Sequence, residues 1–195
     1  MRFRSVAGIA ALLGLAVLAF ARQPSTQPSH TTAKPGGDND YVISAMRVQE
    51  MKGITFLYVS AETNYGAMHQ TVTDAMSGFE EAIKAGKFSP DGATLFIYHG
   101  ASQDPNKNFT LEMGFPVAED TKPFGDYKVK KLDAFKCATV LYSGAVANIG
   151  QAYQQVFSEL FQQGLKPTGE TREFHFMWEG PESPNNVSLI QVGVE

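Results

Sequence analysis

Six short segments of the chain carry apolar residues in runs or in alternation with polar ones. They are rich in β-branched and aromatic residues and are bounded by Gly, Pro, Asn or Asp, which is the pattern of β-strands. The six segments span residues 54–59, 93–99, 109–117, 137–142, 171–178 and 187–194. We therefore expect a domain built largely on strands.

Two further segments place apolar residues three and four positions apart, the spacing of one helix face. The first set is Met68, Val72, Ala75, Met76, Phe79 and Ile83, and the second is Ile149, Tyr153, Val156, Phe157, Leu160 and Phe161. Gly86 and Gly164 follow as helix stops, and Asn148 with Gln151 fits a capping box before the second helix. The order strand–helix–strand–strand thus occurs twice, over about residues 50–120 and 125–195.

The two units also resemble each other in sequence. At a constant offset of 84 positions (141 − 57), residues 57–72 match residues 141–156 at seven places, where chance predicts roughly one. The matching residues of the first segment are Leu57, Tyr58, Ala61, Asn64, Gly66, Gln70 and Val72. This pattern predicts an internal repeat.

Side chains alternate between the two faces of a strand, so their spacing groups several candidate binding residues. Phe96 and Tyr98 share a face of one strand, and Glu173 and His175 share a face of another. Glu112 points away from its apolar neighbours in a third strand. Glu112 either lines a binding site or faces water on a half-exposed sheet.

The N-terminus has the features of a secretory signal peptide. Arg2 and Arg4 precede an uncharged apolar run over residues 6–20, and Ala19 and Ala21 are small residues suited to a signal peptidase. The alternative, a membrane anchor, needs about eighteen or more apolar residues, and this run is shorter. We predict cleavage after Ala21.

This interpretation divides the chain into three parts. Residues 1–21 are the signal peptide, residues 22–40 are a disordered linker because they are polar and rich in Pro, Ser and Thr, and residues 41–195 are one folded domain. The mature protein is then secreted or periplasmic. We expect no membrane contact after the signal is cleaved.

Composition and motifs exclude several functions. A formal net charge of −4 and the lack of a large Lys/Arg cluster argue against a nucleic-acid partner. The four histidines show no ligand spacing, so no metal and no cofactor is expected. The chain has a single cysteine and none of the nucleophile-elbow, phosphate-loop or zinc-protease motifs. Binding is therefore a better prediction than catalysis.

Short motifs give the chain a resemblance to a known family. Tyr142-Ser-Gly144 ends one predicted strand, Ile97-Tyr98 lies in another, Glu112-x-Gly114-x-Pro116 in a third and Arg172-Glu-Phe-His175 in a fourth. Together with the repeated element order, these motifs resemble the GyrI-like superfamily, which includes effector-binding domains of AraC-type and multidrug-sensing regulators. The resemblance implies an α+β fold in which duplicated strand-helix-strand-strand units form an antiparallel sheet with two helices on one face. It also implies a cleft between the units that takes up small molecules.

Carried over by position, the family's acidic binding residue matches Glu112 in the first unit. The corresponding position of the second unit is Leu189, a departure that puts cation selectivity in doubt, with Gln191 as the nearest polar substitute. We predict that an exported GyrI-like domain binds a small lipophilic molecule. The predicted ligand-binding residues are Tyr98, Glu112, Glu173, His175, Trp178 and Gln191.

Two alternatives stay open at this point. Some relatives of similar fold are hydrolases of reactive electrophiles, for which Glu112, Glu173 and His175 would be the acid and base candidates. The second alternative is a haem-binding protein of the SOUL type, with His175 as the ligand. Each candidate also has a structural interpretation: Tyr98 and Trp178 as core or rim aromatics, and His175 as a hydrogen-bonded structural histidine.

Overall fold

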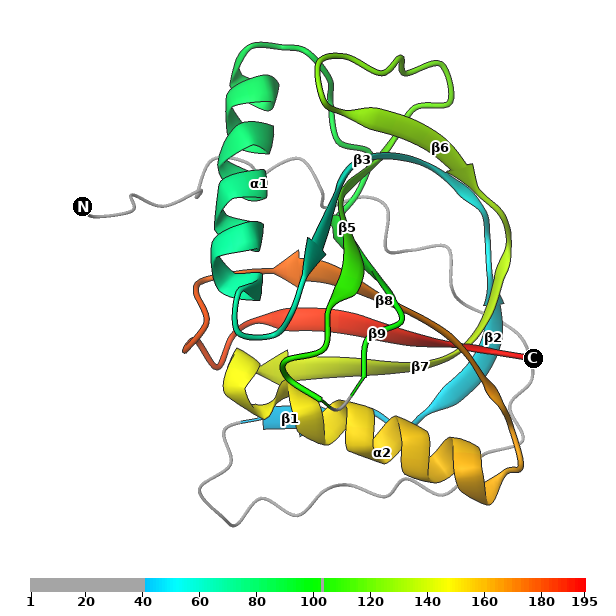
Figure 1. Cartoon of the computed structure of the whole chain (residues 1–195). Coiled ribbons are helices and arrows are strands. Elements are labelled where there is room, and N and C mark those ends of the chain that lie inside the picture. The colour runs from blue at the N-terminus through cyan, green and yellow to red at the C-terminus, as the bar shows by residue number, and fades with distance from the viewer. Residues whose placement is uncertain (1–40, 103) are drawn as a thin grey trace. The chain divides into compact units, whose positions relative to one another are not determined.

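A computed structural model describes residues 41–102 and 104–195, so the predicted signal peptide and linker lie outside the described part of the chain. The described residues form a nine-stranded sheet and two α-helices (Figure 1). The strands are β1 (Tyr41–Ile43), β2 (Arg47–Met51), β3 (Ile54–Thr63), β4 (Thr94–His99), β5 (Phe109–Val117), β6 (Lys128–Leu132), β7 (Phe135–Gly144), β8 (Pro167–Met177) and β9 (Val187–Val194). The helices are α1 (Met68–Lys84) and α2 (Ile149–Gln162).

The predicted fold class is confirmed. The strands pair antiparallel in the order β1-β7-β9-β8-β4-β5-β3-β6, and β2 also pairs with β7. The units β3–α1–β4–β5 and β7–α2–β8–β9 each have the order strand–helix–strand–strand. They join at the middle of the sheet, where β4 pairs with β8. The short strands β1, β2 and β6 are not among the six segments predicted from the sequence.

Both helices end as the sequence predicts but begin differently. Gly86 and Gly164 have φ angles of 66° and 67°, a left-handed conformation that glycine adopts without strain, and each lies two residues after the last helical residue. The capping-box prediction is wrong, because the Asn148 side chain makes no capping bond. Ahead of α1, which also has no side-chain capping bond, Asn64 Oδ1 accepts from the Ala67 backbone N–H at 3.0 Å. Among the described residues, no helix is long and apolar enough to cross a membrane.

The two helices cover the same face of the sheet, each over its own unit. α1 packs on β3 and β5, and α2 packs on β7 and β9. The core beneath α2 includes Val140, Tyr142, Val156, Leu160 and Ile190, and the cores beneath α1 include Leu57, Phe79, Phe96, Leu111 and Met113. The central strands β4 and β8 therefore lie between the two helix-covered regions, and β8 crosses between α1 and α2 in Figure 1.

The opposite face of the sheet also encloses apolar side chains. Phe56, Leu95, Ile97 and Leu132 form a buried cluster there, with Phe174 packed against it. Figure 1 shows β3 bending strongly along its length, so that this face curves inward. The sheet thus separates two interiors, the helix face and the opposite face.

Residues that match between the two units in sequence do not occupy equivalent positions in the strands. The offset of 84 pairs Leu57 with Leu141, yet Leu57 is buried beneath α1, whereas Leu141 is 45% exposed. Its neighbours Val140 and Tyr142 are the residues that face α2. In β7 the matched sequence is shifted by one residue relative to the positions that face the helix. A shift of one residue exchanges the two faces of a strand.

Candidate functional site

A buried carboxylate occupies the middle of the helix face. Glu173 lies on β8 opposite Phe96 of β4, and only 5% of its surface is exposed. The Tyr98 hydroxyl of β4 donates to its Oε2 at 3.0 Å, and the Tyr153 hydroxyl of α2 donates to its Oε1 at 2.5 Å. One side chain of β8 is thus held by the neighbouring unit and by the covering helix.

His175 lies beside this carboxylate on the same face of β8. Its Nε2 is 3.4 Å from Glu173 Oε2 but is not aligned for a hydrogen bond, and its Nδ1 is 2.9 Å from the Ser188 hydroxyl of β9. The imidazole also meets the edges of two aromatic rings, Phe96 at 4.7 Å and Trp178 at 6.3 Å between centroids. We call Glu173, Tyr98, Tyr153 and His175 the Glu173 site.

The protonation states of this site follow from its contacts. Burial alone raises the pKa of Glu173, but the imidazole of His175 and the two phenols lower it by more, so the net pKa lies below its usual value. Burial, followed by the charge of Glu173, raises the pKa of both Tyr98 and Tyr153 well above the usual value. At neutral pH the site therefore holds a carboxylate and two protonated phenols.

A third tyrosine stands nearer to solvent. Tyr65, ahead of α1, is partly exposed and packs against Phe109 at 5.1 Å between ring centroids. Phe109 in turn lies 5.9 Å from the Tyr98 ring. Burial and the charge of Glu173 raise the pKa of Tyr65. A continuous set of aromatic rings therefore leads from the surface to the buried carboxylate.

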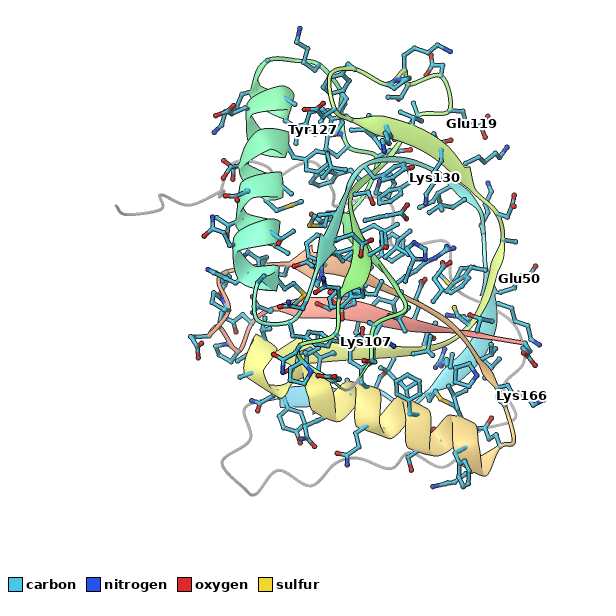
Figure 2. All side chains as sticks on the ribbon, in the orientation of Figure 1. Glu50, Lys107, Glu119, Tyr127, Lys130 and Lys166 are labelled. Carbon is cyan, nitrogen blue, oxygen red and sulfur yellow. The ribbon has the colours of Figure 1, made fainter. Side chains whose placement is uncertain are left out.

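Glu112 belongs to a different cluster, on the opposite face of the sheet. It is 8% exposed, and the ammonium of Lys130 on β6, labelled in Figure 2, lies 2.6 Å from its Oε2. His99 Nε2 of β4 lies 3.0 Å from the same oxygen. Burial raises the pKa of Glu112, but His99 and Lys130 lower it below its usual value. We call Glu112, Lys130 and His99 the Glu112 cluster. Its carboxylate is paired with the ammonium of Lys130.

Gln191 is also on the opposite face. It lies on β9 across from Thr139 and Arg172, and 1% of its surface is exposed. Neither polar atom of its amide finds a hydrogen-bond partner among the described residues. The Arg172 guanidinium stacks on the Phe135 ring at 3.8 Å. Gln191 is therefore part of the inner packing of the curved sheet.

The six predicted binding residues thus divide between the two faces. Tyr98, Glu173 and His175 meet in one site, and Trp178 stands at its edge, 56% exposed. Glu112 and Gln191 lie on the other face and do not join them.

Leu189, the predicted counterpart of Glu112 in the second unit, lies on β9 across from Phe174 of β8, on the same face of the sheet as Glu112. The equivalence of the two positions stays a prediction.

Sequence reasoning missed Tyr153 and Ser188 as members of the site. Tyr153 was placed on the apolar face of the second helix, and its hydroxyl was a usable signal, because a buried tyrosine hydroxyl needs a partner. Ser188 carries no signal of its own, since only the pairing of β8 with β9 brings it to His175. Both are long-range contacts.

The chemistry available at the Glu173 site is that of a charged and aromatic binding centre. A buried carboxylate attracts a cation that can leave water, and aromatic faces attract the same cation. Within residues 41–102 and 104–195, His, Cys, Asp and Glu side chains do not gather in threes that could hold a metal ion.

Solved structures share this fold at low sequence identity. The C-terminal domain of EcmrR is 18% identical with a TM-score of 0.61, covering 77% of this chain and 97% of that one. EcmrR in a complex with DNA is 18% identical with a TM-score of 0.64 and covers 80% of this chain, which spans 57% of the EcmrR chain.

SAV2435 bound to tetraphenylphosphonium is 14% identical with a TM-score of 0.56, covering 77% of this chain and 94% of that one. A hydrolase from Listeria innocua is 11% identical with a TM-score of 0.52, covering 77% of this chain and 91% of that one. At these identities the likeness shows the fold alone.

The sequence itself identifies the family. A comparison with curated proteins found no match. The family profile of the GyrI-like small molecule binding domain, however, matches residues 44–194. This match covers both units of the sheet and all residues of the Glu173 site. The chain therefore belongs to the GyrI-like small molecule binding domain family.

Proposed function

We propose that this domain binds a small lipophilic molecule that carries a positive charge, with Glu173 as the counter-ion. The observation that carries the proposal is that Glu173 is buried and ionised while no Lys or Arg of the described residues forms an ion pair with it. Burial of a carboxylate is unfavourable unless a charge or hydrogen bonds compensate it. A lipophilic cation would supply that charge and bury apolar area against the aromatic rings.

Two further observations support this proposal. The family is one of small-molecule binding, and one solved structure of similar fold is SAV2435 bound to tetraphenylphosphonium, a lipophilic cation. In this chain the rings of Tyr65, Phe109 and Tyr98 lie in sequence toward Glu173. Their flat apolar faces suit a ligand of the same kind.

The test is a titration with tetraphenylphosphonium, followed by calorimetry and by the fluorescence of Trp178, the single tryptophan. Trp178 lies beside His175, so ligand binding should change its emission. Glu173→Gln should weaken binding at least tenfold, about 1.4 kcal/mol, because it removes the negative charge that attracts the cation. The matched control is Glu112→Gln, which removes a buried carboxylate from the opposite face and should leave affinity within about twofold of wild type.

Two results would overturn the proposal. Wild type without detectable affinity for lipophilic cations at neutral pH would contradict ligand charge as the recognised feature. Equal weakening by both variants would show that Glu173 has no special part in binding. A folded spectrum by circular dichroism is required of each variant before its affinity is compared.

Hydrolysis of a reactive electrophile is a second candidate function. The observation in its favour is that two protonated phenols, Tyr98 and Tyr153, donate to one carboxylate, an arrangement that can transfer protons as acid and base. Glu112, the third acid–base candidate from the sequence, lies too far off in the fold, on the other face. Incubation with strained electrophiles and mass spectrometry of the products decides the matter: a hydrolase loses turnover in Tyr153→Phe while it still binds substrate.

The haem alternative gains no support from His175. Its Nδ1 is hydrogen-bonded to Ser188, and its Nε2 is buried 3.4 Å from the Glu173 carboxylate. A Soret band that appears on haem addition and disappears in His175→Ala would restore this alternative.

We also propose that the domain is exported, on the basis of Arg2, Arg4 and the small residues Ala19 and Ala21. The full chain has a formal net charge of −4, and the mature domain is not expected to contact nucleic acid. N-terminal sequencing of the exported protein should find Arg22 first. Retention of Met1 in a membrane fraction would instead indicate an anchored protein.

A further inference from the structure

The Glu173 site contains a second ionisable group beside its carboxylate. His175 Nε2 is buried, lies 3.4 Å from Glu173 Oε2 and has no hydrogen-bond partner among the described residues. Unlike the phenols, which hold the carboxylate through short bonds, the imidazole stands next to it without a formed bond. A nitrogen so placed can carry a charge or none.

Ser188 makes both charge states of His175 acceptable. In the neutral imidazole, a lone pair on Nε2 would face the carboxylate, so the proton belongs on Nε2 and the Ser188 hydroxyl donates to Nδ1. In the charged imidazole both nitrogens carry protons, and the same hydroxyl accepts from Nδ1. The 2.9 Å contact between Nδ1 and Ser188 Oγ serves either state. The site is therefore built to hold the imidazole in place whether or not it is charged.

The other ionisable groups around Glu173 keep their charge over the same pH range. Glu173 on β8 has a lowered pKa and stays ionised, and the phenols of Tyr98 on β4, Tyr153 on α2 and Tyr65 ahead of α1 have raised pKa values and stay neutral. β9 contributes the uncharged Ser188 hydroxyl. Among the described residues, no Lys or Arg forms an ion pair with Glu173. Among the side chains of this site, histidine is the type that ordinarily changes its charge near neutral pH.

We propose that His175 determines which charge class of ligand the site accepts, by competing with a ligand cation for Glu173. Protonated His175 pairs with Glu173 and makes the site neutral, which suits an uncharged lipophile. Neutral His175 leaves the carboxylate free for a cation. This inference rests on the proposed function, because it concerns the same carboxylate, and it makes cation binding release one proton at low pH.

The experiment compares two probes across pH. Tetraphenylphosphonium keeps its charge at every pH, and triphenylphosphine oxide is an uncharged molecule with similar rings. Calorimetry of wild type should show tetraphenylphosphonium binding about tenfold more weakly at pH 5.5 than at pH 8, as expected when a proton on His175 competes with the cation for Glu173. Binding of triphenylphosphine oxide should change by less than about twofold, or strengthen, over the same range.

Two variants locate the proton. His175→Gln keeps a polar side chain without a charge, and the tenfold pH dependence should fall below about twofold. His99→Gln is the matched control, because His99 also stands beside a carboxylate, Glu112, on the opposite face. That variant should bind with the pH dependence of wild type.

Measurements on wild type keep the test decisive if His175→Gln does not fold. Calorimetry in buffers of different ionisation enthalpy should count nearly one proton released per cation bound at pH 5.5, and the NMR titration of the His175 ring should move to lower pH on cation binding. Wild type that binds the cation with equal affinity at both pH values, or His175→Gln with an unchanged tenfold dependence, overturns the inference and leaves the proposed function standing. No binding of the cation at any pH overturns the proposed function itself.

Discussion

The two buried glutamates of this domain have opposite surroundings. Glu112 sits on the opposite face with the ammonium of Lys130 at 2.6 Å, whereas Glu173 sits on the helix face between two tyrosine hydroxyls. Both carboxylates have a lowered pKa and are ionised at neutral pH. The difference is the charge that compensates them: the protein supplies a lysine to Glu112, and supplies Glu173 with only a histidine that can lose its charge.

This contrast separates stability from binding. A carboxylate that is paired with a lysine of the same protein contributes to the stability of the folded state. Its charge is already compensated, so it attracts a cationic ligand only weakly. A carboxylate held by neutral donors keeps most of its charge for whatever enters the site. Four predictions follow from this separation of roles, beginning with the largest effect.

Removal of the lysine cation from the Glu112 cluster should cause the largest loss of stability. Lys130→Met leaves a nearly buried carboxylate with only the half-exposed His99 beside it. We expect the free energy of unfolding at pH 7 to fall by about 2–3 kcal/mol, somewhat less than for a fully buried pair because Lys130 is partly exposed. Urea denaturation measures this change.

The double variant Lys130→Met with Glu112→Gln is the control for that prediction. It removes both charges and should recover most of the loss, since no unpaired charge remains buried. A double variant as unstable as Lys130→Met alone would show that lysine packing, and not charge pairing, stabilises this face.

Removal of a tyrosine hydroxyl from the Glu173 site should cause the next largest loss of stability. Tyr153→Phe removes one hydrogen bond to the Glu173 carboxylate, and we expect the free energy of unfolding at neutral pH to fall by about 1.5–2 kcal/mol. Tyr58→Phe is the control on the opposite face, because the ring that lies under Lys130 remains in place. Equal effects of the two substitutions would contradict the role given to the Tyr153 hydroxyl.

Acid should weaken the fold through both carboxylates. A lowered pKa in the folded state means that each glutamate adds stability above its unfolded pKa, near pH 4.5, and loses that contribution as the pH falls through the folded value. Urea denaturation from pH 6 to pH 3 should therefore show wild type losing more stability than Glu112→Gln, by about 1 kcal/mol. Parallel curves for the two proteins would remove Glu112 from this account.

Substitution of Gln191 should cause the smallest change in stability. Its buried amide has no hydrogen-bond partner among the described residues, so Gln191→Met, of similar length and apolar, should raise the free energy of unfolding by about 0.5–1 kcal/mol. The affinity for tetraphenylphosphonium should not change. A loss of that affinity would place Gln191 in the binding site after all.

The sequence predicted the fold well because its signals are local. Alternation and β-branched composition located β5 and β9 over the residues that form them, and the apolar stripes located both helices. Strand periodicity also paired Glu173 with His175 correctly on one face. These features depend on neighbours within a few residues.

The site was predicted only in part because its membership depends on distant contacts. Periodicity shows that Glu112 and Glu173 each occupy one face of a strand, but not that these are different faces of the sheet, which is settled by the pairing of β4 with β5 and β8. Tyr153 reaches Glu173 only through the packing of α2. The sequence match of Leu57 with Leu141 likewise pairs a buried position with an exposed one, because the match is shifted by one residue in β7.

The most direct test of the division between Glu173 and Glu112 is a crystal structure of the domain grown with tetraphenylphosphonium at pH 8. The account predicts that the phosphonium centre lies on the helix face, next to the Glu173 carboxylate and against the rings of Tyr98 and Tyr153, while the Lys130–Glu112 pair stays closed. A phosphonium bound on the opposite face with the Lys130–Glu112 pair opened, and the Glu173 site unchanged, would contradict it.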